Sequence, residues 1–203
     1  AYEINKIVTI NEASVYISYS DVSEAAGDIR HLAFSSGIDD IIREAFSEGE
    51  KKLVVLISRS SYSAEDMAAA VTRVYRENPA LVPKEPLASV NMYSGTGAQR
   101  LYEISINYGM TSDELDARTA QLQAVDAFAE LDTSGMSEAE LAYAACEYLM
   151  EHCAVSVDKS DNTAYAALVG GRANSEGAAL AYIVLCRELG VDCRIVYGQE
   201  DWI

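Results

Sequence analysis

The spacing of hydrophobic residues in the first half of the chain predicts strands that alternate with helices. Residues 4–10 and 15–19 are rich in β-branched and aromatic side chains, which favours two strands joined around Asn11 and Glu12. Residues 22–49 are expected to form a mixed helical region, with apolar residues at helical spacing over 38–46. The unbroken apolar run 53–57 predicts a strand that is buried on both faces.

A helix and a β-hairpin are predicted next. Ser63 and Asp66 have the spacing of a capping box, which predicts a helix from this point to about residue 76. Residues 87–93 and 99–108 read as the two arms of a hairpin around a glycine-rich turn at 94–97. That turn lacks the helix and lysine of a phosphate loop. Alternate residues of the helix and of the second arm are expected to face the core: Met67, Ala70, Val71, Val74, Tyr102, Ile104, Ile106 and Tyr108.

The second half of the chain has a helical pattern. Two further capping boxes, Thr111 with Glu114 and Ser137 with Glu140, predict two helix starts. The inward faces of these helices are expected to carry Leu115, Leu122, Val125, Phe128 and Ala129, and then Leu141, Ala145, Tyr148 and Leu149.

A third helix is predicted to begin after Asn174, whose side chain can cap it. Residues 178–186 are all apolar or nearly so, which predicts a helix buried on every side, with Tyr182 and Leu185 largely covered. Gly190 suits a left-handed helix stop. The alternation over residues 191–198 predicts a strand, and the helix is expected to pack against the sheet that contains it.

Residues 165–198 resemble the nucleophile-bearing segment of bacterial transglutaminase-like proteins, which share the papain-like fold. In that family a cysteine opens a buried helix, a glycine follows two residues later, and a Gly-Ile/Val-x-Cys strand comes next. Here Ser175 stands at the cysteine position, Gly177 follows, and the strand motif is Gly190-Val-Asp-Cys193. The two preceding helices extend the resemblance loosely to residues 111–198.

The hydrophobic pattern and the resemblance together predict an α+β fold in two parts, of which the resemblance covers the second. Residues 1–110 are expected to form an N-terminal α/β region that contains the β-hairpin. Residues 111–203 are expected to form a partial papain-like, transglutaminase-like helical core with a strand. The sheet that carries the family's catalytic histidine and aspartate is expected to be missing, since Asp201 and Trp202 stand near the His-x-Trp position without a histidine.

The chemistry implied by the family is acyl transfer or amide hydrolysis by cysteine, histidine and aspartate. Only Ser175 occupies a catalytic position, and it is expected to be inactive. A helix start lowers the pKa of a cysteine, but a serine needs an adjacent general base. The two histidines of the chain, His31 and His152, are expected to lie at the surface or at a helix end.

Three hypotheses about function remain open. The chain is a transglutaminase-like pseudoenzyme that acts as a binding or structural module. Alternatively, it is a fragment or an inactivated form of a cysteine acyltransferase or peptidase, with Ser175 natural or introduced. The third hypothesis is an unrelated acidic interaction domain whose helix matches the motif by chance.

Composition narrows the choice of partners. The chain has 32 acidic and 15 basic residues and a net charge of −17, which disfavours nucleic acid and anionic lipid. The longest apolar run has nine residues, at 178–186, so no membrane insertion is expected. The start shows neither methionine nor a signal-like pattern. The expected partner is therefore an unidentified protein or peptide.

The four cysteines form two pairs spaced by seven residues, Cys146 with Cys153 and Cys186 with Cys193, and no CxxC motif occurs. The first pair would be about 10 Å apart along one helix, too far for a bond. Free thiols are therefore favoured over a disulfide, and a metal site is favoured least. No cofactor is expected. The even count slightly favours an exported or cell-surface location.

Overall fold

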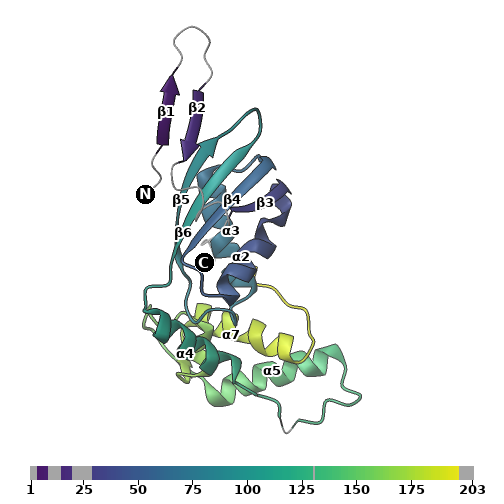
Figure 1. The fold of residues 1–203 in the computed structure, drawn as a ribbon. Coiled ribbons are helices and arrows are strands. Elements are labelled where there is room, and N and C mark those ends of the chain that lie inside the picture. The colour runs from purple at the N-terminus through teal and green to yellow at the C-terminus, as the bar shows by residue number, and fades with distance from the viewer. Residues whose placement is uncertain (1–3, 9–14, 20–28, 130, 197–203) are drawn as a thin grey trace, which may run out of the picture.

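The computed structural model describes residues 4–8, 15–19, 29–129 and 131–196. A sheet with helices on one face occupies the upper part of the molecule in Figure 1, and the later helices lie below it. The α+β class expected from the sequence is confirmed. Among the described residues, none of the helices combines the length and the apolar character needed to cross a bilayer.

The first two strands form an antiparallel pair. β1 (Ile4–Val8) pairs with β2 (Val15–Tyr19), from Ile4 opposite Tyr19 to Val8 opposite Val15. The predicted pair of strands is confirmed over these residues, and the predicted joint around Asn11 lies outside the described residues.

The central sheet has the strand order β3-β4-β6-β5. β3 (Ile29–Phe34) runs parallel to β4 (Lys52–Arg59). β6 (Arg100–Asn107) is antiparallel to both β4 and β5 (Leu87–Ser94), so the predicted hairpin is confirmed. The helical expectation for residues 22–49 is wrong over β3. This edge strand shows no regular alternation of buried and exposed residues, so its pairing with β4 determines its structure.

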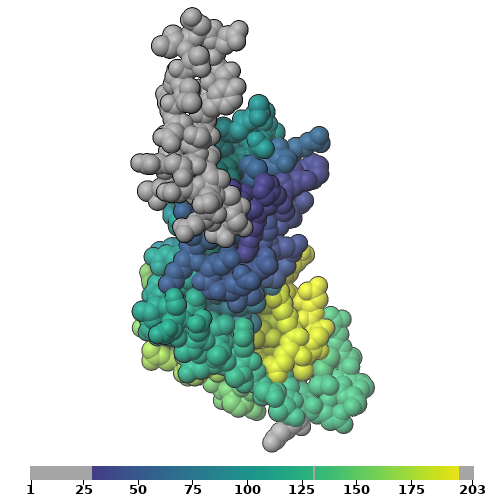
Figure 2. All heavy atoms as spheres, in the orientation of Figure 1, coloured from purple at the N-terminus to yellow at the C-terminus, as the bar shows by residue number. Residues whose placement is uncertain are grey.

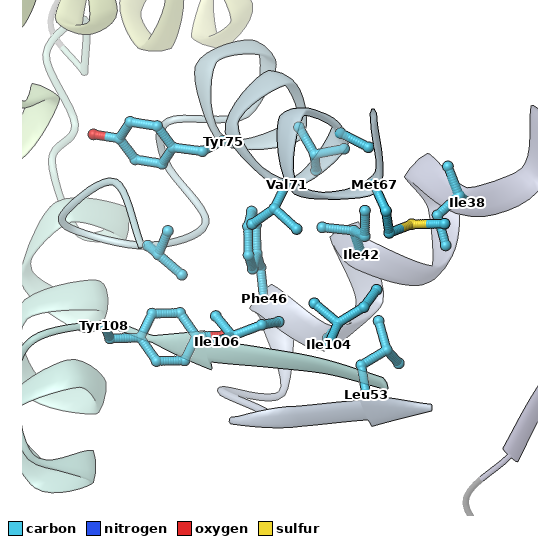
Figure 3. Close-up of a cluster of buried hydrophobic side chains, with 14 of the residues drawn as sticks. Ile38, Ile42, Phe46, Leu53, Met67, Val71, Tyr75, Ile104, Ile106 and Tyr108 are labelled. Atoms are coloured by element: carbon cyan, nitrogen blue, oxygen red, sulfur yellow. The ribbon is translucent and has the colours of Figure 1, made fainter. Parts of the chain in front are cut away.

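Two helices cover one face of this sheet. α2 (Ile38–Ser47) follows a short 3-10 helix at Ser35–Gly37, and α3 (Ala64–Glu77) follows β4. Figure 3 shows Ile42, Phe46, Met67 and Val71 of these helices facing the side chains of Leu53, Ile104 and Ile106. The predicted inner faces of α3 and β6 are confirmed, because all eight side chains are buried.

The predicted capping box opens α3. The hydroxyl of Ser63 accepts a hydrogen bond from the backbone N–H of Asp66 at 3.1 Å, and the Asp66 carboxylate accepts one from the Ser63 N–H at 2.8 Å. Equivalent reciprocal boxes open α4 (Ser112–Gln123) at Thr111 and α5 (Glu138–His152) at Ser137. All three predicted boxes are confirmed.

The lower layer contains α4, α5, the short helix α6 (Ala164–Leu168) and α7 (Ser175–Glu188). A small parallel pair, β7 (Ala154–Val155) with β8 (Arg172–Ala173), joins the segments before α6 and α7. Leu122 of α4 and Leu180 of α7 belong to the same buried cluster as the α3 side chains. One hydrophobic core therefore continues from the sheet layer into the helical layer.

The predicted strand after α7 is wrong over residues 191–196, which form neither helix nor strand. Val191, Cys193 and Ile195 are still more buried than their neighbours, so the predicted inward face is present without the strand. A strand requires hydrogen bonds to a neighbouring strand, and none pairs with this segment in the described part of the chain. α7 is consequently covered by α5 and α6 rather than by a sheet containing this segment. Residues 197–198 lie outside the described residues.

All four cysteines are free thiols, as expected. Cys186 is buried, Cys153 and Cys193 are half-buried, and Cys146 is exposed. Burial and the neighbouring Cys186 thiol raise the pKa of Cys193 to about 11, and burial also raises the pKa of Cys153.

Candidate functional site

The candidate site is the first turn of α7, and Asn174 determines where that turn begins. The Asn174 backbone is extended, and its side-chain oxygen accepts hydrogen bonds from the N–H groups of Glu176 and Gly177, both at 3.0 Å. These bonds satisfy two of the N–H groups that every helix start leaves without an internal partner. Ser175 is therefore the first helical residue, as predicted, and its side chain is exposed.

Behind this exposed start, α7 is enclosed on all sides. No residue from 177 to 186 is exposed, and Leu180, Ala181 and Leu185 are almost completely buried. Tyr182 is only half-buried, less than predicted, and its hydroxyl donates to the carbonyl of Ala142 at 3.0 Å. Gly190, at φ +74°, ends the helix in the predicted left-handed conformation. The prediction of a buried helix is confirmed.

The loop at residues 158–163 packs directly on the first turn of α7 at Gly177. A Cβ atom at this position would lie 2.5 Å from the carbonyl oxygen of Asp161 and 2.9 Å from the backbone nitrogen of Thr163. No side chain larger than hydrogen fits there without movement of the backbone. Because Gly177 has no side chain, the loop can pack directly against the start of the helix.

Asp161 anchors that loop. Its buried carboxylate accepts a hydrogen bond from the Ser156 hydroxyl at 2.6 Å and forms an ion pair with the Arg172 guanidinium at 3.1 Å. The Asp161 carbonyl accepts from the N–H of Asn174 at 2.9 Å, and the Asn174 amide donates to the carbonyl of Asp158 at 3.3 Å. The sequence analysis missed this network. Its signal is weak, because polar residues over 156–162 are equally typical of an ordinary surface turn.

A second carboxylate lies beside Ser175. Glu176 forms an ion pair with Arg76 of α3, with 3.7 Å between the Glu176 Oε1 and Arg76 Nη2 atoms. The Asn162 amide donates to the other carboxylate oxygen at 3.5 Å. An acidic side chain in a first helical turn is stabilised by the helix dipole. The same negative charge would oppose an anion at residue 175, so it weakens the effect of the helix start.

Neither histidine is hydrogen-bonded to Ser175 in the described part of the chain. His31 is exposed on β3. His152 is the last residue of α5, its Nδ1 atom lies 2.9 Å from the carbonyl oxygen of Tyr148, and its ring stacks on the Tyr148 ring at 4.2 Å between centroids. The surface and helix-end positions predicted for the two histidines are confirmed.

This geometry favours a thiolate more than an alkoxide at residue 175. The exposed position and the helix N-terminus are the features that lower a cysteine pKa. A serine there would need a base to remove its proton, and the buried Asp161 carboxylate is already bonded to Ser156 and Arg172. Among the described residues no cluster of three or more histidine, cysteine or acidic side chains is arranged to hold a metal ion.

Comparison with known proteins identifies the region that contains this site. A search of curated proteins finds no match to the chain. The family model of the transglutaminase-like superfamily matches residues 126–201, which include α5, α6 and α7 and therefore Asn174, Ser175 and Gly177. The resemblance inferred from residues 165–198 is confirmed by this match. The matched part of the chain is therefore similar to the transglutaminase-like superfamily.

Proposed function

We propose that this transglutaminase-like domain is catalytically inactive and acts as a binding or structural module. The observation that carries the proposal is the residue at the nucleophile position. Ser175, which the resemblance places at the family's cysteine position, begins an exposed helix turn, and no histidine is hydrogen-bonded to it within the described ranges.

The size of the helix-dipole effect supports the proposal that Ser175 is inactive. A helix N-terminus stabilises a negative charge by about 1 kcal/mol at an exposed site, which is less than one pKa unit. That effect is useful for a thiol, whose pKa is about 8.5, but it leaves an aliphatic hydroxyl protonated at neutral pH. Serine catalysis therefore depends on a general base within hydrogen-bond reach, and the described surroundings of Ser175 offer none.

The proposal is tested by activity and by labelling. The protein is expected to incorporate no amine donor into a glutamine substrate, to cleave no peptide, and to resist a fluorophosphonate that acylates activated serines. The Ser175→Ala variant is the matched control, because it removes only the hydroxyl. Stoichiometric labelling that maps to Ser175 and disappears in the control would show that a base activates the serine.

A second candidate function is an inactivated or partial form of a cysteine acyltransferase or peptidase. The specific observation in its favour is the intact helix start, where the Asn174 cap and the close packing at Gly177 would suit a cysteine equally well. Amide turnover by the Ser175→Cys variant would favour this candidate. The third hypothesis, an unrelated acidic domain, is set aside because the family model matches residues 126–201.

A further inference from the structure

A groove lies between the two layers, at the end of α7 remote from Ser175. Its volume is about 760 Å³, and its walls come from α2, α3, the last turns of α7 and residues 192–195. In Figure 2 the yellow surface near the end of α7 lies directly below the purple-blue surface of the early helices. Ser175 and Arg187 are twelve residues apart on one helix, or about 18 Å along its axis. The Arg187 end of the groove is thus remote from Ser175, although Arg76 lines the groove and also pairs with Glu176.

The groove is rich in arginines, although the chain as a whole is strongly acidic. Five of the fifteen basic residues line it, although the protein carries 32 acidic residues and a net charge of −17. All five are arginines, whose planar guanidinium groups bind carboxylates in a bidentate manner. The five are Arg43, Arg73, Arg76, Arg187 and Arg194.

These arginines differ in what already neutralises them. Arg73 binds both carboxylate oxygens of Asp39, at 2.5 and 3.2 Å, and Arg43 lies 2.6 Å from Asp40. Arg187 and Arg194 form no ion pair within the part of the chain that the structure describes, although Glu77 and Asp192 also line the groove. Arg187 donates to the Asn78 side-chain oxygen at 3.3 Å, which holds its guanidinium at the wall.

Apolar atoms form the rest of the lining. Ala69 of α3 and the half-buried Ile195 expose apolar surface to the groove, and the almost completely buried Ile183 of α7 lies behind them in the lining. A small anion such as phosphate would use the arginines and leave these apolar atoms uncovered. A ligand that carries both carboxylates and apolar side chains would cover both kinds of surface.

We propose that this groove binds an acidic peptide segment of a partner protein. Its carboxylates pair with Arg187 and Arg194, and its apolar side chains lie on Ala69 and Ile195. A nucleic acid or an anionic membrane fits less well, because the net charge of −17 of the chain repels a long polyanion. A short peptide meets mainly the lining of the groove, where five arginines outnumber Glu77 and Asp192. This proposal is independent of whether residue 175 is catalytic.

Three fluorescein-labelled octapeptides test the proposal by fluorescence anisotropy with the full chain. The first alternates glutamate with leucine, the second has glutamine in place of glutamate, and the third has lysine there. The glutamate peptide is expected to bind saturably, at least about tenfold tighter than the glutamine peptide, because each charge-assisted pair contributes on the order of one such factor. The lysine peptide is expected to bind elsewhere and to be insensitive to groove substitutions.

The variant Arg187→Gln/Arg194→Gln is expected to weaken binding of the glutamate peptide by about tenfold or more. Arg118→Gln/Lys159→Gln is the control, because it changes the net charge equally outside the groove. Unchanged unfolding midpoints establish that both variants fold. The proposal is overturned by equal affinities for the glutamate and glutamine peptides, by an equal loss in the control variant, by complete competition from inorganic phosphate, or by no saturable binding up to about 1 mM peptide.

Discussion

At the scale of single residues, the start of α7 depends on a few contacts, some of which can be predicted from the sequence and some of which cannot. Asn174 was predicted as the helix cap, because asparagine before an apolar run is a strong local signal. Asp161 was not predicted. Its role depends on a buried position and on Arg172, eleven residues away, and no local pattern encodes either.

Gly177→Ala is the sharpest test of the packing at this helix start. Alanine favours a helix by about 1 kcal/mol over glycine. Here, however, the added methyl would overlap the backbone of Asp161 and Thr163. The overlap is expected to dominate, with a net loss of about 1–3 kcal/mol in the free energy of unfolding.

Urea denaturation measures this loss. Ser175→Ala is the control, because an exposed substitution two residues before the contact is expected to change stability by less than about 0.5 kcal/mol. A Gly177→Ala variant as stable as the native protein would mean that the loop does not lie against the helix as described.

At the scale of elements, the helices were predicted better than the strands. α3, α4 and α5 begin at capping boxes, whose two bonds form within four residues and are therefore visible in the sequence. β3 and the segment 191–196 show the opposite case. β3 became a strand because β4 lies beside it, and residues 191–196 did not because no described strand pairs with them. Pairing with distant residues leaves little local signal.

The capping boxes also predict how two carboxyl groups titrate. The hydrogen bonds from the Ser63 backbone and side chain lower the pKa of Asp66, and those from Ser137 lower the pKa of Glu140. Because each pKa is lower in the folded state, the stabilisation is present above the ordinary carboxyl pKa of about 4 and is lost as the pH falls through the lowered value.

NMR titration of the side-chain carboxyl carbons tests this prediction. Ser63→Ala is expected to raise the pKa of Asp66 part of the way towards its ordinary value, because the backbone N–H bond of residue 63 remains, and to leave the pKa of Glu140 unchanged. Ser137→Ala is expected to have the converse effect, so that each variant is the control for the other. Equal pKa values in the native protein and both variants would contradict the assigned boxes.

At the scale of the whole molecule, the sheet layer and the transglutaminase-like layer share buried side chains. Leu180 of α7 and Leu122 of α4 belong to the same cluster as Val74 of α3. The continuity of this core could not be read from the sequence, because periodicity shows which face of an element is apolar but not which element covers it. The division into residues 1–110 and 111–203 stays a prediction.

Leu180→Ala tests whether the shared core couples the layers. The substitution is expected to destabilise the protein by about 2–5 kcal/mol, as is usual for a fully buried leucine. Hydrogen exchange is expected to show that amides of β4 and α7 lose protection together, because both elements contribute to one cluster. Loss of protection confined to α4–α7 would show that the layers unfold independently.

The central proposal is that residue 175 lies at the nucleophile position of the fold and that no general base lies beside it among the described residues. The most direct measurement is the pH dependence of iodoacetamide labelling of a Ser175→Cys variant, with Cys153 and Cys193 as internal references. The exposed helix start alone is expected to lower the thiol pKa by less than one unit, from about 8.5 to about 8, with Glu176 limiting the shift. The reference thiols are expected to titrate higher, Cys193 at about 11.

A pKa near 4, as in a cysteine–histidine ion pair, would reveal a base and contradict the claim of inactivity. A pKa at or above the ordinary value would contradict the placement of residue 175 at the helix start.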